Sequence, residues 1–301
     1  MLIKPRTEPE ELLLLRILNT RWNLDPKEAS NYLHLEKGYL GEKQFDLLLK
    51  DLKGDWLMLN DLLFDCSNTV FQIDSLLISQ GTIYLFEVKN YEGDFYVEKD
   101  NWYTAAGNEI KNPLLQLKRS ESLFRRLIHE LGFTFNVEAH LIFINPVFFL
   151  YQAPLNLPII FPPQLTRFFD QLSRKSAEIF GKPFKLAEKL AAIHIKKSQY
   201  AKRPSYTYQQ IQKGIICKSC GLFLTNDDIK ILTCKSCGHK EGVSSAILRS
   251  VKEFQILFPS EKVTTNVIYD WCRIMKSKKA IRNTLSGNFK KVGVGRSAHY
   301  I

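Results

Sequence analysis

Two apolar runs, residues 70–78 and 83–90, constrain most strongly what this chain can fold into. Each has the length and apolar content of a buried β-strand. The first run contains one carboxylate, Asp74, and the second ends in a carboxylate and an amine, Glu87 and Lys89. Because side chains two residues apart on a strand share a face, Glu87 and Lys89 project together. If the two runs pair, Asp74 lies beside them.

Two carboxylates and an amine at one place are typical of phosphodiester-cleaving metal sites. Magnesium prefers oxygen ligands, so Asp74 and Glu87 are the candidate metal ligands, with the carbonyl of Val88 as a third oxygen. Lys89 would orient or deprotonate the attacking water, or stabilise charge on the phosphate. The alternative is structural, with a Glu–Lys pair at a strand end and a partly exposed aspartate. Buried carboxylates cost free energy unless they are paired, which indicates that either a bound cation or Lys89 offsets their charge.

The surrounding residues resemble a known family. The motifs are, in chain order, Gly41-Glu42, Gln72-Ile73-Asp74, Phe86-Glu87-Val88-Lys89-Asn90 with Gly93, Trp102, and Asn112-Pro113-Leu114-Leu115-Gln116. From Gly41 to about His129, this order resembles the NERD (nuclease-related) domain, which is grouped by resemblance with the PD-(D/E)xK nucleases. The resemblance implies a strand sheet flanked by helices, with Mg²⁺ or Mn²⁺ as cofactor. It implies a catalytic set of Glu42, Asp74, Glu87, Lys89 and Gln116.

Each of the two outlying members of that set also has a structural interpretation. Glu42 lies near the expected start of a helix at residues 42–52, where a carboxylate would face the positive end of the helix dipole. Gln116 lies one turn into another expected helix, where a glutamine can hydrogen-bond between helix and sheet. Ser75 departs from the family pattern, in which a histidine or a bulkier polar residue is expected.

The order of elements predicts a mixed α/β fold with helices on a central sheet. The resemblance implies that this fold is PD-(D/E)xK nuclease-like. We expect a first domain over residues 1–200, with amino-terminal helices and a core at about 38–146. The expected helices are 7–37, 42–52, 113–131 and two short ones within 164–197, and the expected strands are 56–64, 70–79, 82–90, a hairpin over 93–104, and 137–145.

Four cysteines, Cys217, Cys220, Cys234 and Cys237, form two Cys-x-x-Cys pairs with thirteen residues between the pairs. This spacing predicts a four-cysteine zinc site in a zinc ribbon over residues 205–242. A redox pair or an iron–sulfur cluster are the alternatives. Because four-cysteine sites leave no open position for a substrate, we expect the zinc to be structural.

The carboxy-terminal residues 243–301 are expected to fold as a small helical, basic region that binds nucleic acid. Helices at 244–258, 263–275 and 278–287 followed by a short hairpin would give the outline of a winged helix-turn-helix. The alternative is a solvated basic helix on a small helical cap. The residues expected to contact nucleic acid are Lys278, Lys279, Arg282, Lys290, Lys291 and Arg296.

The 301-residue chain has a formal net charge of +11, which favours a polyanionic partner. Its first ten residues are polar and acidic, unlike a secretory signal. We therefore expect a cytoplasmic, metal-dependent nuclease that hydrolyses phosphodiester bonds in DNA or RNA, with DNA the preferred partner. We expect no membrane partner and no small-molecule cofactor. The alternative is a non-catalytic nucleic-acid-binding or regulatory protein that uses the same fold for recognition.

Overall fold

The computed structural model describes residues 1–195, 203–225, 230–273 and 278–301. The chain divides into two compact units. Unit 1 comprises Met1–Glu8 and His34–Ala201, and unit 2 comprises Pro9–Leu33 and Lys202–Ile301. Residues 9–33 were expected to belong to the first domain, but they pack with the carboxy-terminal residues instead.

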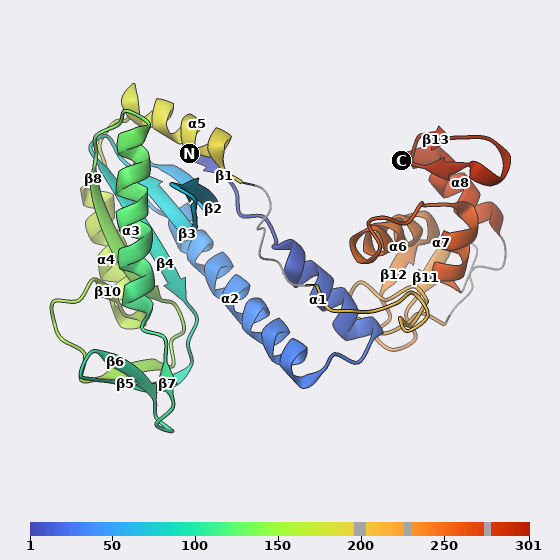
Figure 1. Cartoon of the computed structure of the whole chain (residues 1–301), viewed down its shortest axis with the longest axis horizontal. Helices are drawn as coiled ribbons and strands as arrows, with labels where there is room; N and C mark the ends of the chain where they lie inside the picture. Colours follow the sequence, from blue (N-terminus) through green and yellow to red (C-terminus); the bar gives the residue numbers. More distant parts are fainter. Residues whose placement is uncertain (196–202, 226–229, 274–277) are drawn as a thin grey trace. The chain divides into compact units, whose positions relative to one another are not determined.

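Unit 1 is built on a mixed six-stranded sheet with the strand order β1-β2-β3-β4-β8-β10 (Figure 1). Strands β2, β3 and β4 pair antiparallel, whereas β1, β8 and β10 add to this meander in parallel. The strands are β1 (Leu2–Lys4), β2 (Leu57–Cys66), β3 (Thr69–Ile78), β4 (Thr82–Lys89), β8 (Asn136–Phe143) and β10 (Ile159–Ile160). The mixed α/β sheet predicted from the sequence is confirmed.

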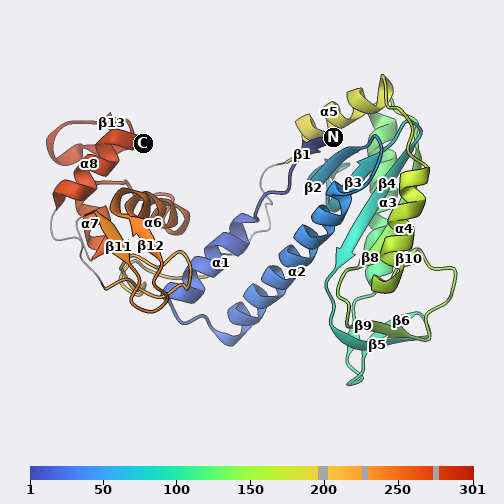
Figure 2. The ribbon, with the colours of Figure 1, turned by 180° about the vertical axis from the view of Figure 1, so that it is seen from behind.

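Four helices cover the two faces of this sheet. Helices α3 (Pro113–Glu130) and α5 (Lys182–Ile193) pack on one face, and α2 (Pro26–Lys50) and α4 (Leu165–Arg174) pack on the other. Figure 1 shows α3 in front of the strands, and Figure 2 shows α4 from the opposite side. The predicted helix break near Gly38 is wrong, because α2 is continuous. A glycine inside a helix costs only about 1 kcal/mol, which packing against the sheet offsets.

A second, four-stranded sheet follows the end of β4, in the order β7-β6-β5-β9. Its strands are β5 (Gly93–Glu98), β6 (Asn101–Thr104), β7 (Glu109–Ile110) and β9 (Phe148–Tyr151). Strands β5 and β6 form the predicted hairpin. The proline-rich segment after β8 contains β9, β10 and the short 3-10 helix η1 (Pro162–Gln164).

Unit 2 has one apolar core, which α1 shares with the cysteine-rich segment and the carboxy-terminal helices. Its elements are α1 (Glu10–Arg21), β11 (Ile231–Thr233), β12 (Lys240–Gly242), α6 (Val243–Leu257), α7 (Thr265–Cys272), α8 (Lys278–Asn288), β13 (Lys291–Val292), η2 (Gly295–Ser297) and β14 (His299–Tyr300). The three predicted carboxy-terminal helices and the terminal hairpin are present, although residues 274–277 lie outside the described part of the chain.

The described helices include none that combines the length and the apolar character needed to cross a membrane.

Candidate functional site

Strands β3 and β4 separate at the position of the candidate carboxylates. Their pairing ends at Ser75 and Phe86, while β4 continues to pair with β8 as far as Lys89. Beyond this last pair, the Asp74 side chain replaces the backbone of β3 as the hydrogen-bond partner of β4. Its Oδ2 accepts a hydrogen bond of 2.8 Å from the backbone N–H of Val88. The separation therefore leaves Asp74 fixed to β4 through its carboxylate.

Strands β2 and β3 also change their alternation here. Along each strand, every second side chain faces the α3 side of the sheet, but this period shifts by one residue midway. On β2 the residues facing α3 are Leu57 and Leu59, then Leu62 and Phe64; on β3 they are Phe71 and Ile73, then Leu76 and Ile78. The shift coincides with Asp61, whose φ of 53° lies in the left-handed region that non-glycine residues seldom adopt. The irregularity lies beside Asp74, where the strands diverge.

Glu87, Lys89 and Gln116 form a hydrogen-bonded group on the α3 face of β4. The Lys89 Nζ lies 2.7 Å from Glu87 Oε1 and donates a 3.1 Å hydrogen bond to Gln116 Oε1. Gln116 is held in place because α3 begins at Pro113, capped by the side chain of Asn112. The shared face predicted for Glu87 and Lys89 is thus present, and the structure brings Gln116 to them.

Burial perturbs the ionisation of this group. Glu87 is 2 % exposed and Asp74 is 6 % exposed. Burial and the charge of Asp74 raise the pKa of Glu87 to about 8, although Lys89 opposes the shift. Burial likewise raises the pKa of Asp74. Burial lowers the pKa of Lys89, but the negative charges of Glu87 and Asp74 outweigh it and raise that pKa overall. Lys89 is therefore a cation at neutral pH.

Glu42 is bound by an arginine that the sequence reasoning missed. Arg6, which follows β1, donates from Nη1 to Glu42 Oε2 at 2.6 Å. The same guanidinium donates to both carboxylate oxygens of Asp46, each at 2.9 Å, and to the backbone carbonyl of Asp74 at 2.8 Å. Burial, followed by the charge of Asp74, raises the pKa of Glu42 to about 8. The sequence could have indicated Asp46, because it lies one helical turn after Glu42 and so shares its face of the helix. It contains no comparable sign for Arg6.

Gly41 allows α2 to approach the end of β4. A Cβ added at Gly41 would lie 2.6 Å from the Cβ of Asn90, too close for any real contact. Asn90 fixes this approach, because its Nδ2 donates a 2.8 Å hydrogen bond to the backbone carbonyl of Lys37 in α2. The Gly-Glu pair therefore places Glu42 over the sheet. The alternative role for Glu42 at a helix start is wrong, since α2 begins at Pro26.

The three carboxylates do not form a compact cage. In the described residues, the four cysteines are the one group of three or more His, Cys, Asp or Glu side chains whose ligand atoms all lie within 4.8 Å of one another. Glu42, Asp74 and Glu87 are therefore more widely spaced. The oxygen donors of Asp74 and Glu87 nevertheless suit a hard divalent cation, which keeps several waters and needs only one or two protein carboxylates.

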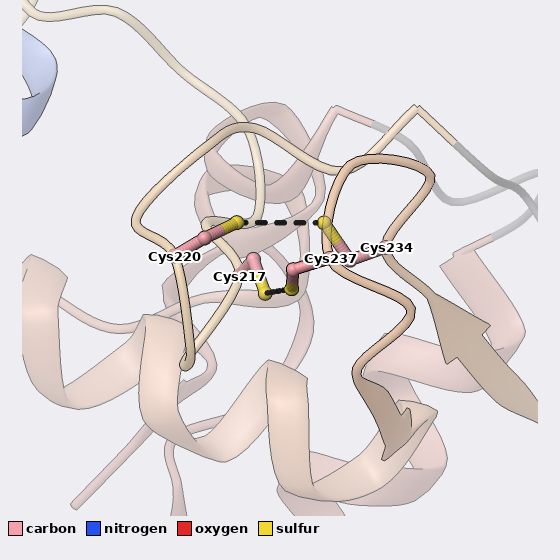
Figure 3. A group of neighbouring side chains, drawn as sticks. All are labelled: Cys217, Cys220, Cys234 and Cys237. Carbon is pink, nitrogen blue, oxygen red and sulfur yellow. Dashed lines mark hydrogen bonds between the residues drawn. The ribbon is translucent and has the colours of Figure 1, made fainter.

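The four cysteines converge as the spacing predicted. The Sγ atoms of Cys217 and Cys237 lie 3.6 Å apart, as do those of Cys220 and Cys234 (Figure 3). A tetrahedral site with Zn–S bonds of about 2.3 Å places neighbouring sulfurs roughly 3.8 Å apart, so the arrangement fits zinc. The other cysteines, Cys66 and Cys272, are buried elsewhere.

The two cysteine pairs sit on matching turns. The N–H of Gly221 donates to the carbonyl of Cys217, and the N–H of Gly238 donates to the carbonyl of Cys234. Both glycines have a φ above 70°, a backbone conformation that residues with a Cβ seldom adopt. The backbone N–H groups of Cys237 and Ser236 lower the pKa of the Cys234 thiol to about 6, which favours the thiolate that binds metal.

The expected nucleic-acid-binding residues lie on an exposed surface of unit 2. Lys278, Lys279 and Arg282 are exposed on α8, whose opposite face buries Ile281 and Leu285 in the core. Two further basic residues of the set, Lys290 and Lys291, are also exposed, whereas the side chain of Arg296 lies outside the description.

Comparison with known proteins gives one match. Residues 37–146 match the family described as NERD, the nuclease-related domain. No curated protein and no solved structure gives a match. The matched segment covers the end of α2, strands β2 to β8 and α3. It contains the expected catalytic set, Glu42, Asp74, Glu87, Lys89 and Gln116, but not Arg6. This part of unit 1 is therefore similar to the nuclease-related domain.

Proposed function

We propose that this protein is a metal-dependent nuclease of the PD-(D/E)xK kind that hydrolyses phosphodiester bonds in DNA or RNA. One observation carries the proposal: two nearly buried carboxylates, Asp74 and Glu87, lie with Lys89 and Gln116 where β3 and β4 separate inside the matched segment. Buried carboxylates with raised pKa values are costly to keep in a fold and are typical of functional sites.

Each residue has a role in this proposal. Asp74 and Glu87 would hold Mg²⁺ or Mn²⁺, which when bound polarises the phosphate and lowers the pKa of a bound water. Because its pKa is raised, Lys89 stays protonated and serves to stabilise negative charge on the phosphate rather than to remove a proton. Gln116 orients Lys89 through their hydrogen bond. Glu42 completes the proposed catalytic set from α2.

The test is cleavage of plasmid and single-stranded substrates with Mg²⁺, Mn²⁺ or chelator. Asp74→Asn, Glu87→Gln and Lys89→Met should each lower the cleavage rate by roughly a hundredfold or more, since each removes metal binding or charge stabilisation. Lys189→Met, on the exposed face of α5, is the matched control and should cut normally. Wild-type rates in all three site variants would refute the assignment. If the wild-type protein cleaves neither substrate with either metal, the nuclease proposal fails and the non-catalytic alternative remains.

We propose further that unit 2 supplies nucleic-acid affinity. Its zinc ribbon, with zinc in a structural role, and its terminal helices, read as a winged helix-turn-helix, would present the basic face of α8. Reversing Lys278, Lys279 and Arg282 to glutamate in the full chain should weaken binding to all sequences. The slope of log K against log salt should become shallower by about 0.9 for each lost phosphate contact. Unchanged affinity and slope would move the binding surface to unit 1.

A further inference from the structure

Arg6 is the most completely bonded charged side chain near the candidate site. Its side chain is only 4 % exposed. Besides Glu42, both oxygens of Asp46 and the carbonyl of Asp74, it reaches the hydroxyl of Ser75 at 3.1 Å. Its Nε, Nη1 and Nη2 groups therefore all donate to acceptors from α2 or β3. A guanidinium stays charged in proteins, so this cation is a permanent part of the site.

Arg6 occupies the carboxylates that a second metal ion would need. Two-metal nuclease sites place their cations about 3.5–4 Å apart and require bridging or flanking carboxylates for both. Apart from Asp74 and Glu87, the described carboxylates whose charges act on this group are Glu42 and Asp46, on one face of α2, and Asp61. Arg6 binds the first two at 2.6 and 2.9 Å. Asp61 is paired with Lys4 at 3.9 Å. A second divalent ion would also meet the repulsion of the guanidinium.

A charge count for the metal-bound state gives the same number. When metal binding has deprotonated all four carboxyl groups, Glu42, Asp46, Asp74 and Glu87 carry four negative charges against two fixed cations, Arg6 and Lys89. Two negative charges remain, which one divalent ion neutralises and two would exceed.

We infer that the site binds a single divalent cation, between Asp74 and Glu87, and that Arg6 takes the place of the second. The inference rests on the proposed function and adds the number of metal ions to it. Arg6 is a positioning residue in this arrangement: it holds Glu42 and Asp46 against β3 and supplies a fixed positive charge. Serine at position 75 fits this role, because its small hydroxyl accepts a hydrogen bond from the guanidinium.

The test counts bound Mn²⁺ by electron paramagnetic resonance in the zinc-loaded full-length protein. Wild type should bind one Mn²⁺ per chain, and Asp74→Asn should lose it. In Arg6→Met, Glu42 and Asp46 are released, so the count should rise to two. Arg126→Met is the matched control, because Arg126 makes an exposed pair with Glu130; its count should stay at one.

A second variant decides the question if Arg6→Met does not fold. Glu42→Gln keeps Arg6 bonded to Asp46, so its count should remain one, whereas a two-metal site would fall from two to one. The inference is overturned by two Mn²⁺ in wild type, by one in a folded Arg6→Met, or by no Mn²⁺ that depends on Asp74. One bound Mn²⁺ without any cleavage would instead refute the nuclease proposal and leave the count intact.

Discussion

Replacing Lys89 with methionine should destabilise unit 1 strongly at pH 9 and weakly at pH 6. Methionine keeps the apolar stem of the side chain but removes the ammonium that lies 2.7 Å from Glu87. The pKa of Glu87 is raised to about 8, so its carboxylate is charged at pH 9 and protonated at pH 6. At pH 9 the variant must therefore bury that charge without its partner or take up a proton, whereas at pH 6 the carboxyl is already protonated.

The magnitude follows from the burial of the pair. Removing one partner of a buried ion pair costs about 3–5 kcal/mol. That cost has a limit here, because at pH 9 the Glu87 carboxyl can take up a proton, which costs about 1.4 kcal/mol when its wild-type pKa is about 8. Together with the lost hydrogen bond, this gives about 2.4 kcal/mol at pH 9. At pH 6 the loss is that of a hydrogen bond, about 1 kcal/mol. The sign follows from linkage: a carboxyl whose folded pKa exceeds its unfolded value of 4.5 lowers stability as pH rises between the two. Loss of Lys89 raises the folded pKa further.

The assay is urea unfolding in chelator at both pH values, followed by the fluorescence of the buried tryptophans of unit 1, Trp56 and Trp102. With a slope of about 2 kcal/mol/M, the midpoint should fall by about 1.2 M at pH 9 and about 0.5 M at pH 6. Lys37→Met is the control, since its pair with Glu92 is exposed and its loss should leave the midpoint nearly unchanged at both pH values. An equal shift at both pH values, or none, would refute the assigned charge pair.

Three further outcomes are expected. Gly41→Ala should cost about 1–3 kcal/mol and lower cleavage, because the new methyl collides with Asn90, whereas Gly38→Ala, with nothing within 4 Å, should fold at least as stably as wild type in the same urea assay. Both ring nitrogens of His140 are buried without hydrogen bonds, and burial lowers the pKa of this side chain. The free energy of unfolding should therefore fall as the pH drops below about 6.5. The variant His140→Phe should not show this fall in thermal melts from pH 5 to 7. Cys220→Ser should lose the metal, measured as zinc per chain, and unfold the region around 215–240 while the circular dichroism of unit 1 persists.

The strands of unit 1 were predictable because their signal is local. Apolar alternation and turn residues placed β3 and β4 within a residue or two of their actual bounds. The helices were less predictable from the sequence. Gly38 and Gly41 read as a helix boundary, yet α2 runs through both, because packing against the sheet outweighs the preference of glycine. The leucines of α1 gave its helical face but not its partner, since any apolar core would accept them.

The candidate site, too, could be predicted from the sequence only in part. Glu87 and Lys89 share a face by the geometry of one strand, so their 2.7 Å pair follows from two positions in the sequence. Arg6 lies 40 residues from Asp46 and 68 from Asp74, and nothing in its own neighbourhood distinguishes it from a surface cation. Only the fold shows that β1 adds to the sheet beside β2 and carries Arg6 to these acids. In our proposal, the motif supplies the groups that bind the metal ion, whereas the number of ions depends on the charge of Arg6, which the motif does not contain.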